Sequence, residues 1–251
     1  MRADETSIGT LRRVLRSRPV RHSVLSAEQQ ITYDKPRQFD YSPIGLKTGS
    51  QPAPAQRFQL ETQGDVFAHV RDALAMCQRK PKGLVPTCGD GFYGLYALKL
   101  GADKVRFADI GAHRGDYRPW PFKQTELAAN MLGLSPRCTF ETCDYSYLQG
   151  RYDFAILSGV LIHFPNPQTV LAKMKEIVSG PLVIFTTTVN RPEIQKFELQ
   201  TPAWRDWGSS FHHDHVITMA VDAGWTVVNE GFKRMPDDWI DERNMSTFLC
   251  V

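Results

Sequence analysis

The chain has 251 residues, of which 42% are hydrophobic, so it is long enough for one α/β domain with an N-terminal extension. Its formal net charge of +3 is too small to indicate a polyanionic partner by itself. No apolar run approaches the ~20 residues that cross a bilayer, and residues 1–19 lack the apolar centre of a signal peptide. We therefore expect a cytoplasmic protein that does not enter the membrane.

The cysteines show no C-x-x-C spacing, which argues against a zinc site and against a disulfide framework. We expect all of them to be reduced. They are Cys77, Cys88, Cys138, Cys143 and Cys250.

The N-terminal part contains two predicted helices, over residues 10–18 and 55–78, separated by a proline-rich irregular stretch. Residues 1–22 hold six arginines against two acidic residues, which is a local basic cluster. We interpret the part before about residue 80 as a cap or arm, with residues 1–55 as an extension outside the main domain.

Beyond residue 80, strand-like and helix-like segments alternate, which predicts a mainly parallel sheet covered by helices on both faces. Two further strand-like segments at the C-terminus have no helix of usual length between them, so the last strand should run antiparallel. The predicted strands are 83–87, 104–110, 137–144, 152–159, 181–189, 225–233 and 245–251, and the predicted helices are 92–102, 122–134, 166–180 and 211–225.

The stretch VPTCGDGFYG (85–94) joins the first of these strands to a helix. The strand is predicted to end at Thr87 and the chain to turn through Gly89 and Gly91, so that backbone N–H groups and the positive end of the helix face a ligand. The alternative is a tight turn without a ligand.

Asp109 closes the next strand, 20 residues beyond Gly89, where a βα unit brings a carboxylate to ribose hydroxyls. The alternative role for Asp109 is to cap the following loop. Because Gly89, Gly91 and Gly94 also satisfy G-x-G-x-x-G, a nicotinamide-dependent oxidoreductase is a second interpretation of the same residues.

Residues 87–110 resemble the first motif and second strand of the class I S-adenosylmethionine (SAM)-dependent methyltransferases, and 152–167 resemble their fourth strand and following loop. The resemblance extends over about residues 56–251 and is closest to the tRNA wobble-uridine methyltransferase-like branch. It implies a Rossmann-like, doubly wound α/β fold with a seven-stranded sheet and an antiparallel C-terminal strand, beneath an N-terminal helical cap. It also implies SAM as the cofactor.

The resemblance further implies a role for each site residue. The glycine turn would hold the cofactor, Asp109 its ribose, Asp144 its adenine amino group and Tyr145 the face of the ring, while Ser158 would line the floor beside the methyl group. The cofactor-binding residues that we expect are Cys88, Gly89, Asp90, Gly91, Asp109, Ile110, Asp144, Tyr145 and Ser158.

Two positions depart from the family pattern, because Val85 stands where the family has an acid and Thr87 where it has a glycine. Valine cannot accept a hydrogen bond from the ammonium group of the cofactor. Our hypothesis is that Asp90 or a residue of the cap makes that contact. The alternatives are a weak site or a SAM-fold binding protein without catalytic activity.

His163 is the expected catalytic base, since the carboxyl end of the fourth strand opens onto the site; its alternative role is to order the loop. The run FHHDHV is interpreted as capping and surface residues at a helix start, so we expect no metal site.

For the methyl acceptor, we favour an O or N atom of a small molecule, including a natural product, because the chain carries no recognisable RNA-binding module. The alternative is tRNA, whose phosphates would meet the N-terminal arginines. These arginines are Arg12, Arg13, Arg16, Arg18 and Arg21.

Overall fold

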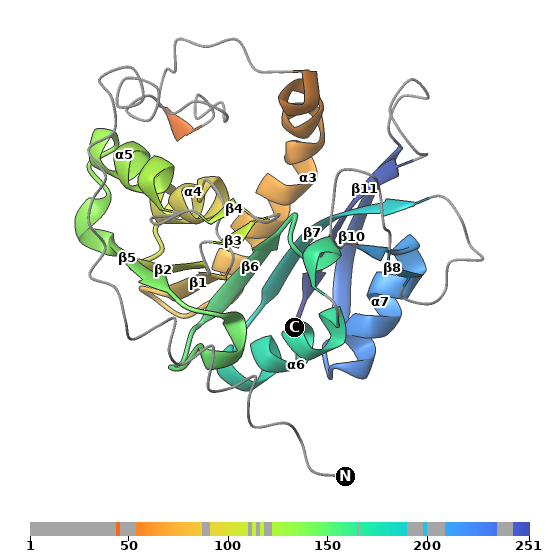
Figure 1. The fold of residues 1–251 in the computed structure, drawn as a ribbon. Helices are drawn as coiled ribbons and strands as arrows, with labels where there is room; N and C mark the ends of the chain where they lie inside the picture. Colours follow the sequence, from red (N-terminus) through yellow and green to blue (C-terminus); the bar gives the residue numbers. More distant parts are fainter. Residues whose placement is uncertain are drawn as a thin grey trace. The chain divides into compact units, whose positions relative to one another are not determined.

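In the computed structural model, the described residues form one main sheet with helices on both faces (Figure 1). Spatial contacts divide the chain into Met1–Thr32 and Tyr33–Val251, and every described residue belongs to the second unit. The predicted helix over 10–18 and the arginine cluster lie outside the described residues. The structure describes residues 44–45, 54–86, 91–109, 112–113, 116–117, 122–164, 166–189, 198–199, 209–234 and 243–251.

The main sheet has seven strands in the order β10-β11-β7-β6-β1-β2-β5. The first five in the chain run parallel to one another, and β11 is antiparallel to both of its neighbours, β7 and β10. This confirms the predicted seven-stranded sheet with an antiparallel C-terminal strand. The strands are β1 (Lys82–Pro86), β2 (Lys104–Asp109), β5 (Cys138–Thr142), β6 (Phe154–Ser158), β7 (Leu182–Val189), β10 (Val227–Arg234) and β11 (Arg243–Cys250).

The helices follow the strands as the alternation predicts, and several begin or end at residues that suit a helix terminus. Gly91 and Gly101 flank α4 in the left-handed conformation, and Pro167 occupies the first turn of α6. The helices are α3 (Pro54–Met76), α4 (Phe92–Leu100), α5 (Lys123–Met131), α6 (Pro167–Ile177) and α7 (His213–Asp222), with short helical turns η2 (Ser135–Arg137), η3 (Tyr145–Tyr147) and η4 (Leu161–His163). Two short pairs complete the described elements: β3 (Ala112–His113) with β4 (Asp116–Tyr117), and β8 (Glu198–Leu199) with β9 (Ser209–Ser210).

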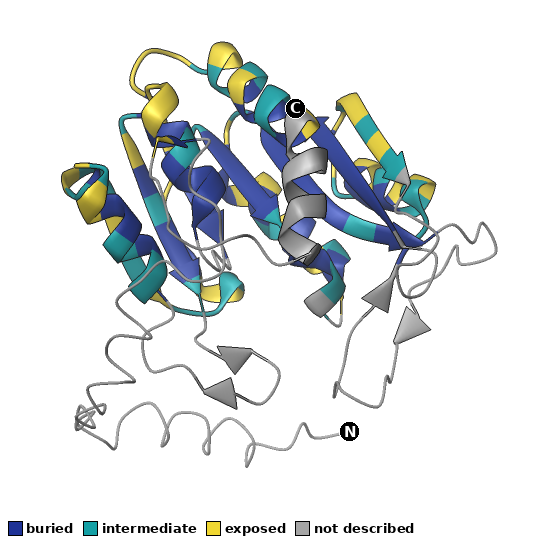
Figure 2. Cartoon of the chain, turned by 90° about the horizontal axis from the view of Figure 1, so that it is seen from above, coloured by how far each residue is buried: buried dark blue, intermediate teal, exposed yellow. Residues whose placement is uncertain are grey.

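Two hydrophobic clusters lie on opposite faces of the sheet, one beneath α3, α4 and α5 and the other beneath α6 and α7. Figure 2 shows the central strands almost entirely buried, with exposed residues on the outer sides of the helices, in loops and on the edge strand β10. Successive side chains of a strand point to opposite faces of the sheet, so neighbouring residues belong to different clusters. In β1, Leu84 faces α6 and its neighbour Val85 faces α4.

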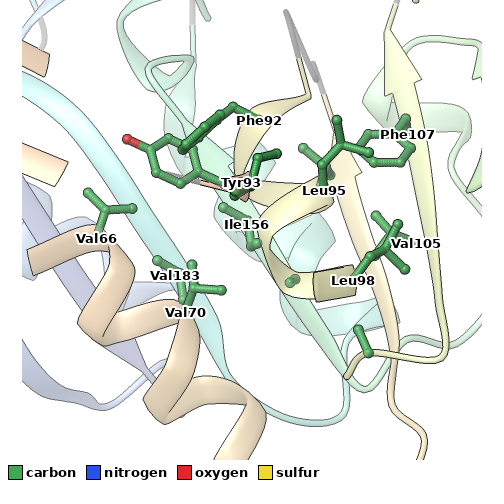
Figure 3. Packing of buried hydrophobic residues seen from close by; sticks show 14 of the residues in the cluster. Val66, Val70, Phe92, Tyr93, Leu95, Leu98, Val105, Phe107, Ile156 and Val183 are labelled. Carbon is green, nitrogen blue, oxygen red and sulfur yellow. The ribbon is translucent and has the colours of Figure 1, made fainter. Parts of the chain in front are cut away.

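Helix α3 is part of this core. The sequence interpretation placed it in a cap or arm before residue 80, and for α3 that interpretation is wrong. Val66 and Val70 are 0% and 1% exposed. In Figure 3 they lie beside Tyr93 of α4 and Val183 of β7. Burial of such side chains stabilises the fold by about 1.5–3 kcal/mol each. The domain limits 1–55 and 56–251 remain a prediction.

The described cysteines are free, in agreement with the expectation of reduced thiols; Cys88 lies outside the described residues. Burial raises the pKa of the Cys138 and Cys250 thiols to about 12 and that of Cys77 to about 11. These three thiols therefore stay protonated at neutral pH and are poor nucleophiles.

Candidate functional site

The carboxyl ends of four neighbouring parallel strands meet at one edge of the sheet. Pro86 at the end of β1 pairs with Ala108 of β2, and the next residue, Asp109, pairs with Thr142 at the end of β5. On the other side of β1, β6 ends at Ser158. With strands about 4.8 Å apart, the line from β6 through β1 and β2 to β5 spans about 14 Å. Crevices at this edge are where open α/β sheets bind ligands.

The turn between β1 and α4 requires glycine at position 91. Gly91 has φ of 68°, and a Cβ atom added there would overlap Cγ2 of Thr125. Thr125 belongs to α5 and is 0% exposed, and its Oγ1 has no hydrogen-bond partner among the described residues. Residues 87–90 lie outside the described part of the chain. The contacts expected of Cys88, Gly89 and Asp90 therefore remain predictions.

Asp109 is the last residue of β2 and is half-buried at the carboxyl edge. Its backbone carbonyl accepts a hydrogen bond from the N–H of Cys143, with an N···O distance of 3.1 Å. This bond holds the end of β2 against the segment that follows β5. Asp109 thus stands at the strand end where the sequence predicted it, whereas Ile110 lies outside the described residues.

Asp144 follows β5 and caps the short turn η3. Its Oδ1 accepts from the backbone N–H of Ser146 at 2.9 Å and from the Ser146 hydroxyl at 2.6 Å. The hydroxyl of the next residue, Tyr145, is 2.8 Å from Oγ1 of Thr169, and its ring packs edge-on against Phe164. Both side chains are therefore already engaged, Asp144 within the turn and Tyr145 toward α6.

Ser158 ends β6 and is half-buried at the carboxyl edge. Gly159 follows with φ of 68°, and its N–H donates to the carbonyl of Phe185 at 2.7 Å, which ties the turn to β7. The backbone of His163 ends the short turn η4 just beyond this point, but its side chain lies outside the described part of the structure. The role of His163 as a base remains a prediction.

Val85 is not at the site but in the core. It is 2% exposed, and its Cγ2 would lie 2.9 Å from a Cβ atom placed on Gly94 of α4. The side chain therefore fills the space between β1 and α4. A carboxylate at this position would be buried among apolar groups.

A group of polar side chains at the far end of β7 was not predicted from the sequence. Thr188 Oγ1 lies 2.8 Å from Ser246 Oγ, which lies 2.9 Å from His213 Nδ1. Nε2 of His213 lies 3.1 Å from Oε2 of Glu230. We call Thr188, Ser246, His213 and Glu230 the β7–β11 polar chain.

The β7–β11 polar chain corrects the interpretation of the FHHDHV run as capping and surface residues. His212 does cap α7, because its ring nitrogen accepts from the N–H of Asp214 at 3.3 Å. The His213 side chain, in contrast, is only 13% exposed and contacts the buried Ser246, so it is not a simple surface residue. Among the described residues, no group of three or more His, Cys, Asp or Glu side chains could hold a metal ion.

Comparisons with known proteins identify the fold. No protein-family model and no curated protein matches the sequence. Among solved structures, the chain resembles the magnesium protoporphyrin IX methyltransferase (ChlM) from Synechocystis PCC 6803 with bound SAM, at a TM-score of 0.58 and 15% identity over 91% of this chain and 99% of that one. It also resembles the 1,6-didemethyltoxoflavin-N1-methyltransferase from Burkholderia thailandensis with bound S-adenosylhomocysteine (SAH), at a TM-score of 0.53 and 21% identity over 81% and 92% of the two chains.

A third similar structure is the [4+2]-cyclase SpnF, at a TM-score of 0.58 and 11% identity over 74% of this chain and 80% of that one. The described residues therefore adopt the Rossmann-like fold of the class I SAM-dependent methyltransferases. Because one of these structures is named for a different reaction, the fold alone does not assign an activity.

Three of the described residues stand where a SAM molecule at the carboxyl edge would meet them. At Gly91, Thr125 of α5 fills the space that a side chain would need, and the turn brings the backbone to the N-terminus of α4. Asp109 and Ser158 stand at the ends of the strands on either side of β1. A nucleoside and an amino-acid moiety could thus lie along one edge, from β2 to β6.

Proposed function

We propose that this protein is a SAM-dependent methyltransferase that acts on an O or N atom of a small molecule. The observation that carries the proposal is the alignment of Gly91, Asp109 and Ser158 at one edge of a sheet with the class I methyltransferase fold. The named substrates of two similar structures, a porphyrin and a toxoflavin precursor, support a small-molecule acceptor.

When bound, SAM supplies an activated methyl group, so the protein's main task is to hold the two reactants in line. In this proposal, Asp109 accepts hydrogen bonds from the ribose hydroxyls and the backbone at Gly91 contacts the amino-acid end. Ser158 and Gly159 leave space above β6 for the acceptor. Oδ1 of Asp144 already caps η3 and the hydroxyl of Tyr145 already meets Thr169, so these residues contact the adenine through their other atoms.

The strand order weighs against a nicotinamide-dependent oxidoreductase. The dinucleotide-binding fold has six parallel strands, whereas here β11 lies antiparallel between β7 and β10. Within the methyltransferases, the assignment to the tRNA wobble-uridine branch rests on sequence resemblance alone. The arginines expected to meet tRNA phosphates lie outside the described residues, so no described residue favours tRNA.

Replacing Asp109 tests the proposed ribose contact. Asp109→Asn keeps the shape but removes the charge, and charge-assisted hydrogen bonds contribute about 1.5–3 kcal/mol. We expect the affinity for SAH, measured by calorimetry, to fall by roughly tenfold or more. Asp103→Asn is the matched control, because Asp103 precedes β2 at the opposite edge of the sheet. Equal SAH affinity in the Asp109→Asn variant and the unmodified protein would place the ribose elsewhere.

A further inference from the structure

The β7–β11 polar chain has a defined direction of hydrogen bonding. When the His213 ring is neutral, its Nε2 donates to the carboxylate of Glu230, which can only accept, and its Nδ1 accepts from the Ser246 hydroxyl. The Ser246 oxygen in turn accepts from the Thr188 hydroxyl. The Thr188 oxygen is then oriented to accept a hydrogen bond from an additional donor.

Asn244 places a second unused polar group beside Thr188. The two residues are paired across β7 and β11, so their side chains stand on the same face of the sheet. Asn244 is 1% exposed, and its Nδ2 has no hydrogen-bond partner among the residues that the structure describes. A buried donor without a partner is destabilising. An acceptor oxygen on a ligand would remove that cost.

Both groups lie on the same edge of the sheet as the proposed cofactor site. Phe185 of β7 pairs with Ser158, and β7 continues beyond it to Val189. Thr188 is three residues beyond Phe185, which is about 10 Å along the strand. Elements β9 and η4 contact this end of β7. Because Thr188 is an odd number of residues beyond Phe185, the side chains of Thr188 and Asn244 stand on the face of the sheet that α6 and α7 cover, at the same carboxyl edge as Ser158.

We propose that Thr188 and Asn244 bind the reactive end of the methyl acceptor, and that the β7–β11 polar chain accepts its proton. This inference rests on the proposed function. The complementary ligand carries a hydroxyl beside a second oxygen: the hydroxyl donates to Thr188, and the second oxygen accepts from Asn244. Burial of both residues suits this role, because a site closed to water strengthens such contacts.

Each proton that leaves one group in the β7–β11 polar chain is taken up by the next group. As the acceptor oxygen forms its bond to the methyl carbon, its O–H bond breaks and the proton goes to Thr188 Oγ1. The Thr188 proton passes to Ser246, and the Ser246 proton passes to Nδ1 of His213. The resulting imidazolium is stabilised by Glu230. The Ser246 hydroxyl is engaged with both Thr188 and His213, so it acts through Thr188 and does not meet the ligand itself.

Catechol is the smallest suitable probe, because it has a hydroxyl beside a second oxygen, and phenol is its one-oxygen control. We expect the SAH-loaded protein to bind catechol more tightly than phenol in calorimetry. Thr188→Val and Asn244→Leu should each weaken catechol binding by roughly tenfold. Thr186→Val is the matched control, because Thr186 lies on the same face of β7, is equally buried, and pairs with Ser246 across the strands without a described hydrogen bond between their side chains. Thermal unfolding of each variant separates lost binding from lost folding.

Several binding results would overturn the inference. SAH binding without any catechol binding would overturn it and leave the methyltransferase proposal standing. An equal loss of catechol binding in the Thr186→Val and Thr188→Val variants would also overturn it. A protein that binds no SAH would end both proposals together.

The role of His213 as a positioning residue is tested with SAM in place of SAH. We expect methyl transfer to catechol, and His213→Gln should leave KM near the unmodified value while lowering kcat by about tenfold or more. His212→Asn, which keeps the helix cap, should change neither constant. Binding of catechol without methyl transfer, or an unchanged kcat in His213→Gln, would overturn the proton-accepting role.

Discussion

Val85 shows how one residue at the end of β1 serves packing instead of ligand binding. In the family that the sequence resembles, an acid stands at this position near the cofactor, but here the side chain lies between β1 and α4, 2% exposed. In the proposed SAM site, the ammonium contact therefore comes from another residue. Our hypothesis assigns it to Asp90, which lies outside the described residues, or to the N-terminal cap, of which only part is described.

Val85→Asp should consequently destabilise the protein without improving SAH binding. A carboxylate moved from water into this apolar cluster carries a desolvation penalty of a few kcal/mol. We expect a lower midpoint of thermal unfolding, whereas Val228→Asp, at a position 47% exposed in β10, should leave it nearly unchanged. A Val85→Asp variant with intact stability and tenfold tighter SAH binding would show that the valine is a degraded ligand position and not a core residue.

At the scale of elements, α3 places a buried histidine against the sheet. His69 is 2% exposed. Burial lowers its pKa below 6.5, although Asp65, Asp72 and a hydrogen bond with Asn229 of β10 oppose that shift. The folded protein therefore holds His69 neutral more strongly than the unfolded chain does.

This difference predicts acid sensitivity. The unfolded chain binds more protons than the folded one between pH 6.5 and the lower pKa of folded His69, so the free energy of unfolding falls as the pH is lowered through this window. Urea unfolding at pH 7.5 and pH 5.5 measures the change. His69→Gln should reduce it, and Asp65→Asn should increase it, because Asp65 favours the charged ring. An identical pH dependence in all three proteins would contradict this account of α3.

At the scale of the whole molecule, alternation of apolar segments was sufficient to predict the sheet and its antiparallel last strand. It was not sufficient to place α3, because a helix before the first strand can pack on the sheet or extend from it. Asp109 and Ser158 were predictable because parallel strands bring their carboxyl ends to one edge. The link between Thr188 and Ser246, 58 residues apart, was not, since it depends on the register of β11 beside β7.

The central claim, that the carboxyl edge binds SAM, is tested most directly by calorimetric titration of the unmodified protein with SAH and, separately, with NAD. The geometry at Gly91, Asp109 and Ser158 predicts a dissociation constant for SAH of about micromolar order, equivalent to roughly 8 kcal/mol, and no measurable heat of binding for NAD. Binding of NAD without binding of SAH would contradict the account.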